Sequence, residues 1–180
     1  KMKSIIRDAK LAPQGHDKIN WVIEHMPVLN SLNKEFIKTK PLAGINMVVT
    51  VHLEAKTAYL CMVLKNAGAN VVVTGSNPLS TQDDVAAALA EHGVGVFAWY
   101  NTTQEEYDQF LHHALDTKPH IIIDDGGDLV SLLHGERADL AANVMGGSEE
   151  TTTGVLRLRA LAAQGRLKFP MISVNDADCK

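Results

Sequence analysis

Side chains able to carry out acid–base chemistry occur in five short groups along the chain. The groups are His52-Leu53-Glu54-Ala55-Lys56-Thr57, the segment GSNPLSTQDD at 75–84, Asp124-Asp125-Gly126-Gly127-Asp128, the segment SEETTTG at 148–154, and Asn175-Asp176 with Lys180. Carboxylates, histidine and lysine are the groups that most often move protons to and from a substrate. Whether they act together depends on where the fold places them.

Each group also has a purely structural interpretation. Ser80 and Asp83 have the spacing of a helix N-cap, and Thr151–Thr153 would cap a later helix behind acidic residues. The pair Asp124–Asp125, followed by two glycines, is typical of a solvated turn, and a single histidine such as His52 is more often structural than catalytic. No set of His, Cys, Asp or Glu has zinc-ligand spacing, and DDGGD does not match a calcium loop, so no metal site is predicted.

Alternating apolar runs and helical patterns predict the scaffold that positions these groups. The expected strands are 45–51, 70–74, 94–99, 120–124 and 169–174, and the expected helices are 54–67, 80–91, 103–115 and 155–163. This alternation favours an α/β fold: a three-layer, doubly wound, mostly parallel sheet of the Rossmann or flavodoxin kind, with helices on both faces. Residues 1–18 are expected to be a loosely packed lead-in to one domain over 19–180. That domain should begin with a helical segment from Ile19 to Phe36 that breaks at Pro27.

The expected sheet brings the five groups together. Ligands of such sheets bind beyond the carboxyl ends of the strands. All five groups should therefore lie on one rim, a coincidence that the separate structural interpretations do not explain. The chain has no dinucleotide fingerprint, because Gly93-Val94-Gly95 precedes a strand and lacks a third glycine, and it has no P-loop. We therefore expect no phosphate cradle.

The composition narrows the class of protein. The chain of 180 residues has 17 Lys and Arg against 21 Asp and Glu, a net charge of −4 without a basic block, so no nucleic-acid partner is expected. The apolar runs are strand-sized, so we expect no transmembrane helix, no signal-peptide core and no membrane partner. The two cysteines, Cys61 and Cys179, do not suggest a disulfide framework, and a reducing cytoplasm is the expected location.

Several motifs together resemble the S-adenosylhomocysteine hydrolase family: VHLEAKTAYL, GSNPLSTQDDVAAALA, IIIDDGGDL, GSEETTTGV and the closing VND. The resemblance runs from about Ile19 to Lys180, and the order and spacing of STQDD, DDGGD and EETTTG are highly specific. The HLEAKTA form resembles the branch found in thermophilic bacteria and archaea. The commoner form has Thr where Glu54 stands and Glu where Lys56 stands.

This resemblance implies reversible hydrolysis of S-adenosylhomocysteine to adenosine and homocysteine. Bound NAD would oxidise the ribose 3′-hydroxyl, the C4′ proton and the thiol would then be lost, and water would add before the hydride returns. The implied catalytic residues, which also bind the substrate, are Asp125 at the ribose C4′, Glu150 and Lys180 at the 3′-oxygen, and His52 near the 5′ leaving group. The residues implied around the adenine are Glu54, Lys56, Thr57, Asn77, Ser80 and Gln82, and those implied to contact NAD are Thr151, Thr152 and Thr153.

The NAD-binding domain of that family has no counterpart in this sequence. The resemblance therefore implies that the chain is the N-terminal substrate-binding portion of a homotetrameric enzyme and is inactive alone. A second hypothesis is a non-catalytic short relative that binds nucleosides or regulates a full-length subunit. A phospho-acceptor receiver domain is disfavoured, because its acidic pair follows the first strand, whereas Asp124–Asp125 follows the fourth expected strand.

Overall fold

The sheet at the centre of the protein has six strands, all paired in parallel. The structure, a computed structural model, describes residues 3–178. The strands are β1 (Asn46–Thr50), β2 (Asn70–Thr74), β3 (Gly95–Phe97), β4 (Ile121–Asp124), β5 (Gly146–Glu149) and β6 (Met171–Ser173). Their order across the sheet is β3-β2-β1-β4-β5-β6, so the direction of winding reverses between β1 and β4. The predicted doubly wound α/β fold is confirmed, and the reversal marks the crevice where such sheets bind ligands.

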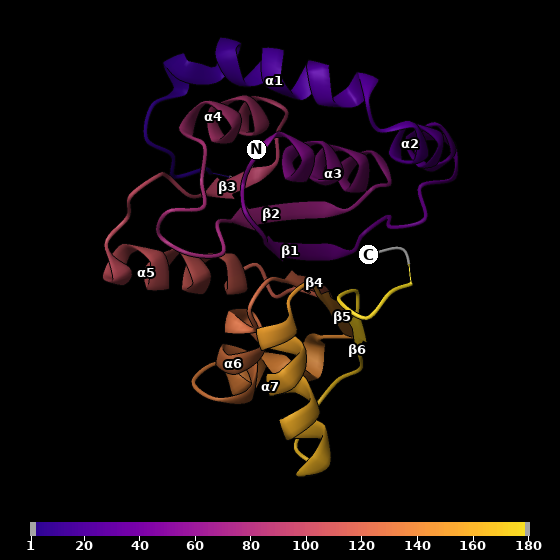
Figure 1. Ribbon diagram of the computed structural model, residues 1–180, viewed down its shortest axis with the longest axis vertical. Coiled ribbons are helices and arrows are strands. Elements are labelled where there is room, and N and C mark those ends of the chain that lie inside the picture. The colour runs from indigo at the N-terminus through magenta and orange to yellow at the C-terminus, as the bar shows by residue number, and fades with distance from the viewer. Residues whose placement is uncertain (1–2, 179–180) are drawn as a thin grey trace.

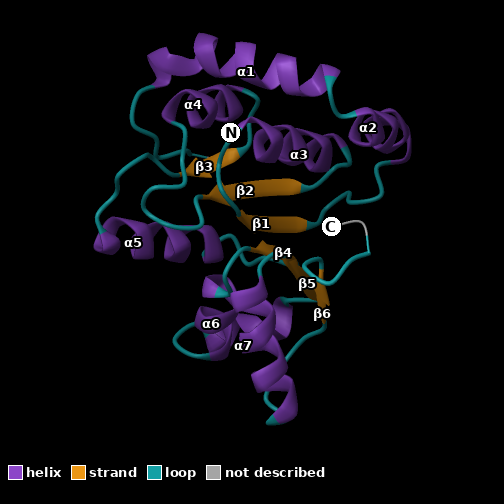
Figure 2. Cartoon of the chain, in the orientation of Figure 1, coloured by secondary structure: helices purple, strands orange, loops and turns teal. Residues whose placement is uncertain are grey.

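Helices cover both faces of this sheet (Figures 1 and 2). On one face lie α3 (Ala55–Asn66) and α4 (Asp83–Glu91), with α1 (Ala12–Glu24) and α2 (Pro27–Thr39) outside them. On the other face lie α5 (Gln104–Leu115), α6 (Asp128–His134) and α7 (Thr152–Ala163). Short 3-10 helices occupy Ala9–Leu11 and Ala138–Asn143. Neighbouring residues Val48 and Val49 of β1 are both fully buried, one in each of the two cores, because successive strand side chains face opposite layers.

The N-terminal residues are more ordered than the sequence predicts. Ile5 pairs with Phe97 of β3 in an isolated bridge, Ala12 is fully buried, and α1 packs against α4. At Gly15 a side-chain carbon would collide with the backbone carbonyl of Asp84, so only glycine allows this close approach. The prediction of a loosely packed lead-in over residues 1–18 is therefore wrong where the chain packs on the sheet at Ile5 and on α4 through α1. The predicted break at Pro27 is confirmed, because Pro27 starts α2 after α1 has ended.

β5 is a strand that the sequence did not predict. Its four residues, GGSE, include no β-branched or large apolar side chain, so it lacks the usual strand signal. It exists because β4 and β6 pair with it on either side. With β5 in place, the sheet has one strand more than the five expected.

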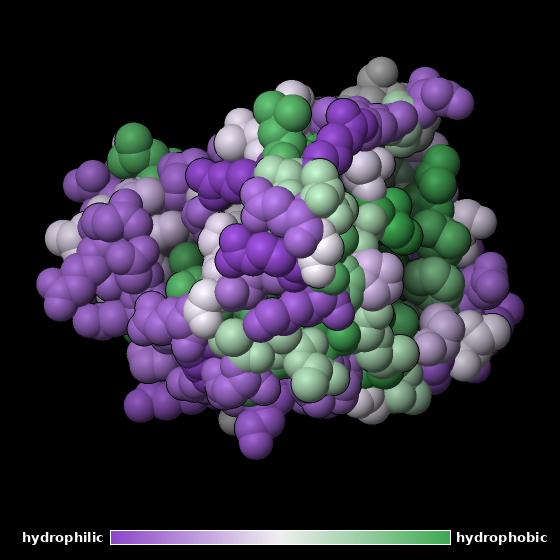
Figure 3. Space-filling model, turned by 90° about the horizontal axis from the view of Figure 1, so that it is seen from below, coloured by the Kyte–Doolittle hydropathy of each residue, from purple (hydrophilic) through white to green (hydrophobic). Residues whose placement is uncertain are grey.

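One part of the sheet surface carries apolar side chains that no described helix covers. It lies over β4–β6 on the face that α3 and α4 cover over β1–β3, and it includes a hollow of about 330 Å³ lined by Met47, Ile121, Ile123, Met145, Gly146, Gly147, Ser148 and Ile172. Met145 and Ile172 are 63% and 71% exposed. From below, patches of hydrophobic residues lie among hydrophilic ones (Figure 3). None of the described helices is both long and apolar enough to cross a bilayer.

Candidate active site

The first cluster of the site gathers at the ends of three neighbouring strands. His52 follows β1, Ser76 lies just beyond β2, and Asp125 follows β4. The His52 Nδ1 atom lies 2.9 Å from Asp125 Oδ2 and 2.9 Å from Ser76 Oγ. The imidazole is 60% exposed and the Asp125 side chain only 8%, so the carboxylate orients a ring that a ligand can reach. The expectation that these strand ends share one rim is met.

This pairing has a definite chemical capacity. An imidazole held through one nitrogen by a carboxylate can take up or release a proton through the other. Ser76 was not selected from the sequence. Its position in the sequence could have indicated it, because Ser76 lies just beyond the end of β2 as His52 lies just beyond the end of the adjacent strand β1.

The two aspartates of DDGGD have different surroundings. Asp124 is fully buried, and its carboxylate accepts hydrogen bonds from Thr50 Oγ1 (2.8 Å), Asp125 N (3.1 Å) and Val130 N (3.0 Å). Burial raises the pKa of Asp124 to about 7, against the opposing effect of the hydrogen bonds from Val130 N and Thr50 Oγ1. Gly126 has φ +107°, a conformation that favours glycine and lets the chain turn sharply after Asp125. Asp124 thus holds the turn from inside, while Asp125 reaches the crevice.

Beyond β5, the chain runs into the first turn of α7. The Glu150 N–H donates to the Asp124 carbonyl at 3.0 Å, which sets Glu150 beside the turn that carries Asp125. Thr151 is the N-cap of α7, and its Oγ1 accepts from Gly154 N at 3.0 Å, so the structural interpretation of this threonine is confirmed. Thr152 and Thr153 are exposed in the first turn. Lys180, the remaining residue of the implied catalytic set, lies outside the described residues.

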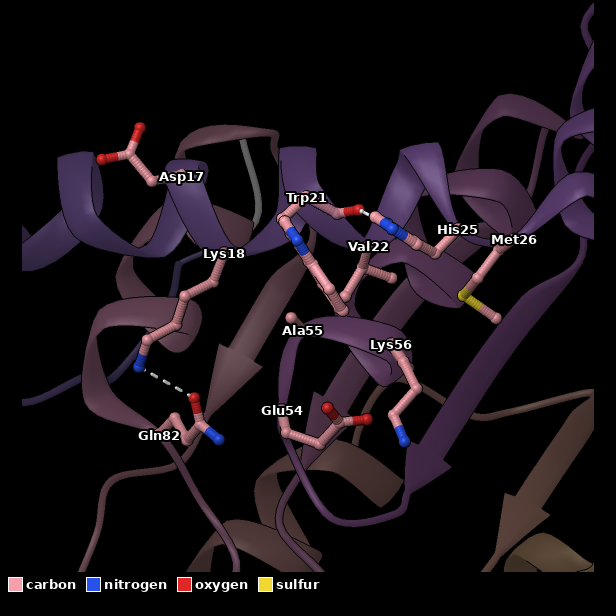
Figure 4. A pocket seen from close by; sticks show the side chains of 10 residues that line it. All are labelled: Asp17, Lys18, Trp21, Val22, His25, Met26, Glu54, Ala55, Lys56 and Gln82. Atoms are coloured by element: carbon pink, nitrogen blue, oxygen red, sulfur yellow. Dashed lines mark hydrogen bonds between the residues drawn. The ribbon is translucent and has the colours of Figure 1, made fainter.

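A hollow with a volume of about 710 Å³ lies beside the N-terminus of α3 (Figure 4). Its lining residues are Asp17, Lys18, Trp21, Val22, His25, Met26, Glu54, Ala55, Lys56 and Gln82. Three of the six residues implied around the adenine, Glu54, Lys56 and Gln82, are therefore brought together. Trp21 stacks on His25, with ring centroids 4.1 Å apart. The contribution of α1 was missed, because its residues carried only a helical pattern.

The other three implied adenine residues are placed differently. Ser80 does not cap α4: its Oγ accepts from Ser76 N (2.9 Å) and Asn77 N (3.1 Å), and Gln82 is the N-cap without a side-chain hydrogen bond. The predicted cap is wrong, because the loop folds back on itself before the helix begins. Asn77 Oδ1 accepts from Leu79 N at 2.9 Å within the same loop. Thr57 is buried in α3 and lines an adjoining hollow instead.

These features define a class of protein. The strand order is that of dinucleotide-binding domains, yet the turn after β1 carries His52 and Glu54 in place of glycines. Among the described residues no group of three or more His, Cys, Asp or Glu could hold a metal ion. The fold is that of a doubly wound α/β domain, with side chains capable of proton transfer, His52 and Asp125, at the switch point of the sheet.

Comparison with known proteins identifies the family. The model of the S-adenosyl-L-homocysteine hydrolase family matches residues 3–143 and 135–180, and the chain belongs to that family. It is 52% identical to S-inosyl-L-homocysteine hydrolase of Methanococcus maripaludis over 98% of this chain and 43% of the relative. It is 54% identical to adenosylhomocysteinase of Thermococcus kodakarensis over 97% of this chain and 42% of the relative. It is 51% identical to adenosylhomocysteinase of Thermotoga maritima over 92% of this chain and 41% of the relative. The chain thus spans less than half the length of the curated relatives that it matches.

Proposed function

We propose that this chain is the substrate-binding portion of a longer enzyme that hydrolyses S-adenosyl-L-homocysteine reversibly to adenosine and L-homocysteine. The observation that carries the proposal is the His52–Asp125 pair, 2.9 Å apart at the switch point of the sheet. The hollow that contains Glu54, Lys56 and Gln82 supports it, because its volume of about 710 Å³ suits a nucleoside. Family membership and the relatives' names supply the reaction class.

In this proposal each side chain has a distinct task. Asp125 takes the proton from ribose C4′, which is acidic only while C3′ is a ketone. His52 protonates the homocysteine sulfur as it leaves C5′. His52 and Asp125 then transfer the protons as water adds at C5′ in place of homocysteine. Glu150 and Lys180 hold the 3′-oxygen and its proton. The orientation of His52 by the Asp125 carboxylate supports this division, since one ring nitrogen is held and the ring stays accessible.

NAD would supply the hydride acceptor and donor for C3′. The described residues fit NAD at one edge of the site: Thr152 and Thr153 are exposed in the first turn of α7, where an electronegative group is favoured, and the Thr152 hydroxyl donates to Asn175 Oδ1 at 3.2 Å. Thr151 is already engaged as the N-cap. The remaining contacts to NAD would come from the rest of the longer protein, since no glycine-rich turn follows β1.

A second candidate substrate is S-inosyl-L-homocysteine, which the name of the Methanococcus maripaludis relative specifies. Lys56 lies in the wall of the hollow together with Glu54 (Figure 4). An ammonium group donates hydrogen bonds only, so it matches the 6-oxo group of hypoxanthine, whereas a carboxylate matches the 6-amino group of adenine. The two substrates therefore use different members of this pair.

We also propose the assembly and location that the family resemblance implies, a homotetramer in the cytoplasm. The domain division remains a proposal, and the packing of α1 on α4 and the bridge from Ile5 to β3 extend the domain to the N-terminal side of residue 19.

The test is release of free thiol from each thioether by the full-length protein with NAD. Homocysteine released from either substrate is the expected result, and Lys56→Met should lower kcat/KM for the inosyl substrate about tenfold or more relative to the adenosyl one. Binding of nucleoside without thiol release from either compound would favour the non-catalytic alternative.

A further inference from the structure

Glu149 is a buried acid within the SEETTTG segment to which the resemblance assigns no role. It ends β5 and is fully buried, in register with Asp124 of β4. Its Oε1 accepts three hydrogen bonds, from Gly126 N, Thr151 N and Thr151 Oγ1, each 2.9 Å long. These donors belong to two different loops: the turn that contains Asp125, and the first turn of α7 after Glu150.

The fold makes room for this carboxyl group at a cost. Any side chain at position 154 would collide with it, so Gly154 is needed to leave the space. The second oxygen, Oε2, is buried without a hydrogen-bond partner among the described residues. Burying an acceptor in this way is unfavourable, and an apolar side chain would fill the same space without that penalty. Glu149 therefore does more than fill volume.

The position of Glu149 between two loops indicates its further role. Backbone pairing between β4 and β5 reaches as far as the hydrogen bond from Glu150 N to the Asp124 carbonyl. Beyond this point the described residues show no further ladder hydrogen bond between the two loops; at the exposed edge Arg157 of α7 adds a separate link, donating from Nη1 to the Gly126 carbonyl at 2.9 Å. The Glu149 side chain bridges them there, because one oxygen receives a backbone donor from each.

We propose that Glu149 is a positioning residue that fixes Asp125 and Glu150 relative to each other by joining their two loops through Oε1. This inference rests on the proposed function, in which Asp125 and Glu150 act on the same ribose. Misplacement of an acid–base group by about 1 Å can lower a rate by on the order of 100-fold. The substrate contacts in the Glu54–Lys56 hollow lie on other elements and should be unaffected.

The experiment uses the full-length protein with NAD and three substitutions of Glu149. Glu149→Ala removes the acceptor, and Glu149→Asp keeps a carboxyl group but is one methylene too short to bridge. Both should lower kcat by roughly 10- to 100-fold with KM within about threefold of wild type. Glu149→Gln retains an oxygen at the Oε1 position and should restore kcat to within about threefold of wild type. Leu133→Ala, a core substitution in α6, controls for loss of stability and should leave the kcat of the folded enzyme unchanged.

Several results would overturn the inference. One is a wild-type kcat in folded Glu149→Ala or, should that variant not fold, in Glu149→Asp; another is a Glu149→Gln variant as slow as Glu149→Asp. If the wild-type protein releases no thiol, the proposed function fails instead. Glu149 is then judged by amide hydrogen exchange at Gly126 and Thr151, which must be faster in Glu149→Asp than in wild type for the inference to stand.

Discussion

Replacing Asp125 by Asn tests whether the two aspartates of the DDGGD turn have different roles. Asparagine keeps the size of the side chain but cannot accept a proton and no longer orients His52 through a charged oxygen. In the full-length protein with NAD, thiol release should fall by about 10²–10⁴-fold, the usual contribution of an acid–base group. The partner of Asp125 is an imidazole that is 60% exposed, so the free energy of unfolding should change by roughly 1 kcal/mol or less.

Asp124→Asn is the matched control. It should lower the free energy of unfolding more than it lowers thiol release, the reverse of Asp125→Asn. The Asp124 carboxylate accepts hydrogen bonds from Val130 N, Thr50 Oγ1 and Asp125 N. In Asp124→Asn an amide nitrogen, which cannot accept, replaces one of the two oxygens, so at least one of these donors loses its partner. Leaving one buried donor unpaired should cost roughly 1–3 kcal/mol of unfolding free energy. Thiol release and urea unfolding are measured for both variants. Near-normal turnover in Asp125→Asn with an inactive, folded Asp124→Asn would refute the assignment, and unfolding of both would make the turn structural only.

Three further predictions concern pH, the loop before α4 and the cofactor. Burial raises the pKa of Asp124 to about 7, so the folded state binds this proton more tightly than the unfolded chain, and unfolding free energy should fall as pH rises from about 4 to about 7. Urea unfolding should therefore show wild type losing stability relative to Asp124→Asn between pH 5 and pH 7.5, by roughly 1–3 kcal/mol; a relative gain would be contrary to the reasoning. Ser80→Ala should cost about 1–2 kcal/mol in thermal unfolding without changing helix content by circular dichroism, since Ser80 Oγ binds Ser76 N and Asn77 N and does not cap α4. The isolated chain should show no micromolar affinity for NAD in calorimetry, because no glycine-rich turn follows β1 and the proposed contacts to NAD within the described residues are limited to the first turn of α7.

The sequence predicts elements well where one local interaction decides the outcome. Thr103 and Glu106 have the spacing of a capping box at the start of the expected helix 103–115, and the box forms: Thr103 Oγ1 accepts from Glu106 N at 3.1 Å and Glu106 Oε2 accepts from Thr103 N at 2.9 Å. Ser80 and Asp83 have the same spacing, yet Ser80 is used by its own loop. The difference depends on how residues 75–80 fold back, which spacing alone does not encode.

Long-range contacts account for most of what the sequence did not predict. α1 is held on α4 by contacts such as Lys18 Nζ with Asp84 Oδ2 at 2.7 Å, between residues far apart in the chain. β5 forms because strands on either side pair with it. The shared rim of the site follows from parallel strand geometry and could be predicted. Which side chains meet there, such as His52 with Asp125, needed the structure, and so did the bridging role of Glu149.

The most direct test of the central claim is hydrogen exchange at ribose C4′. Full-length protein with NAD is incubated with adenosine in D₂O, and deuterium at C4′ is followed by NMR. If Asp125 at the switch point removes this proton, wild-type protein incorporates deuterium at C4′ and Asp125→Asn does so at least about 100-fold more slowly. Exchange at C4′ that is equally fast in Asp125→Asn, or absent in wild-type protein that binds adenosine, would contradict the account.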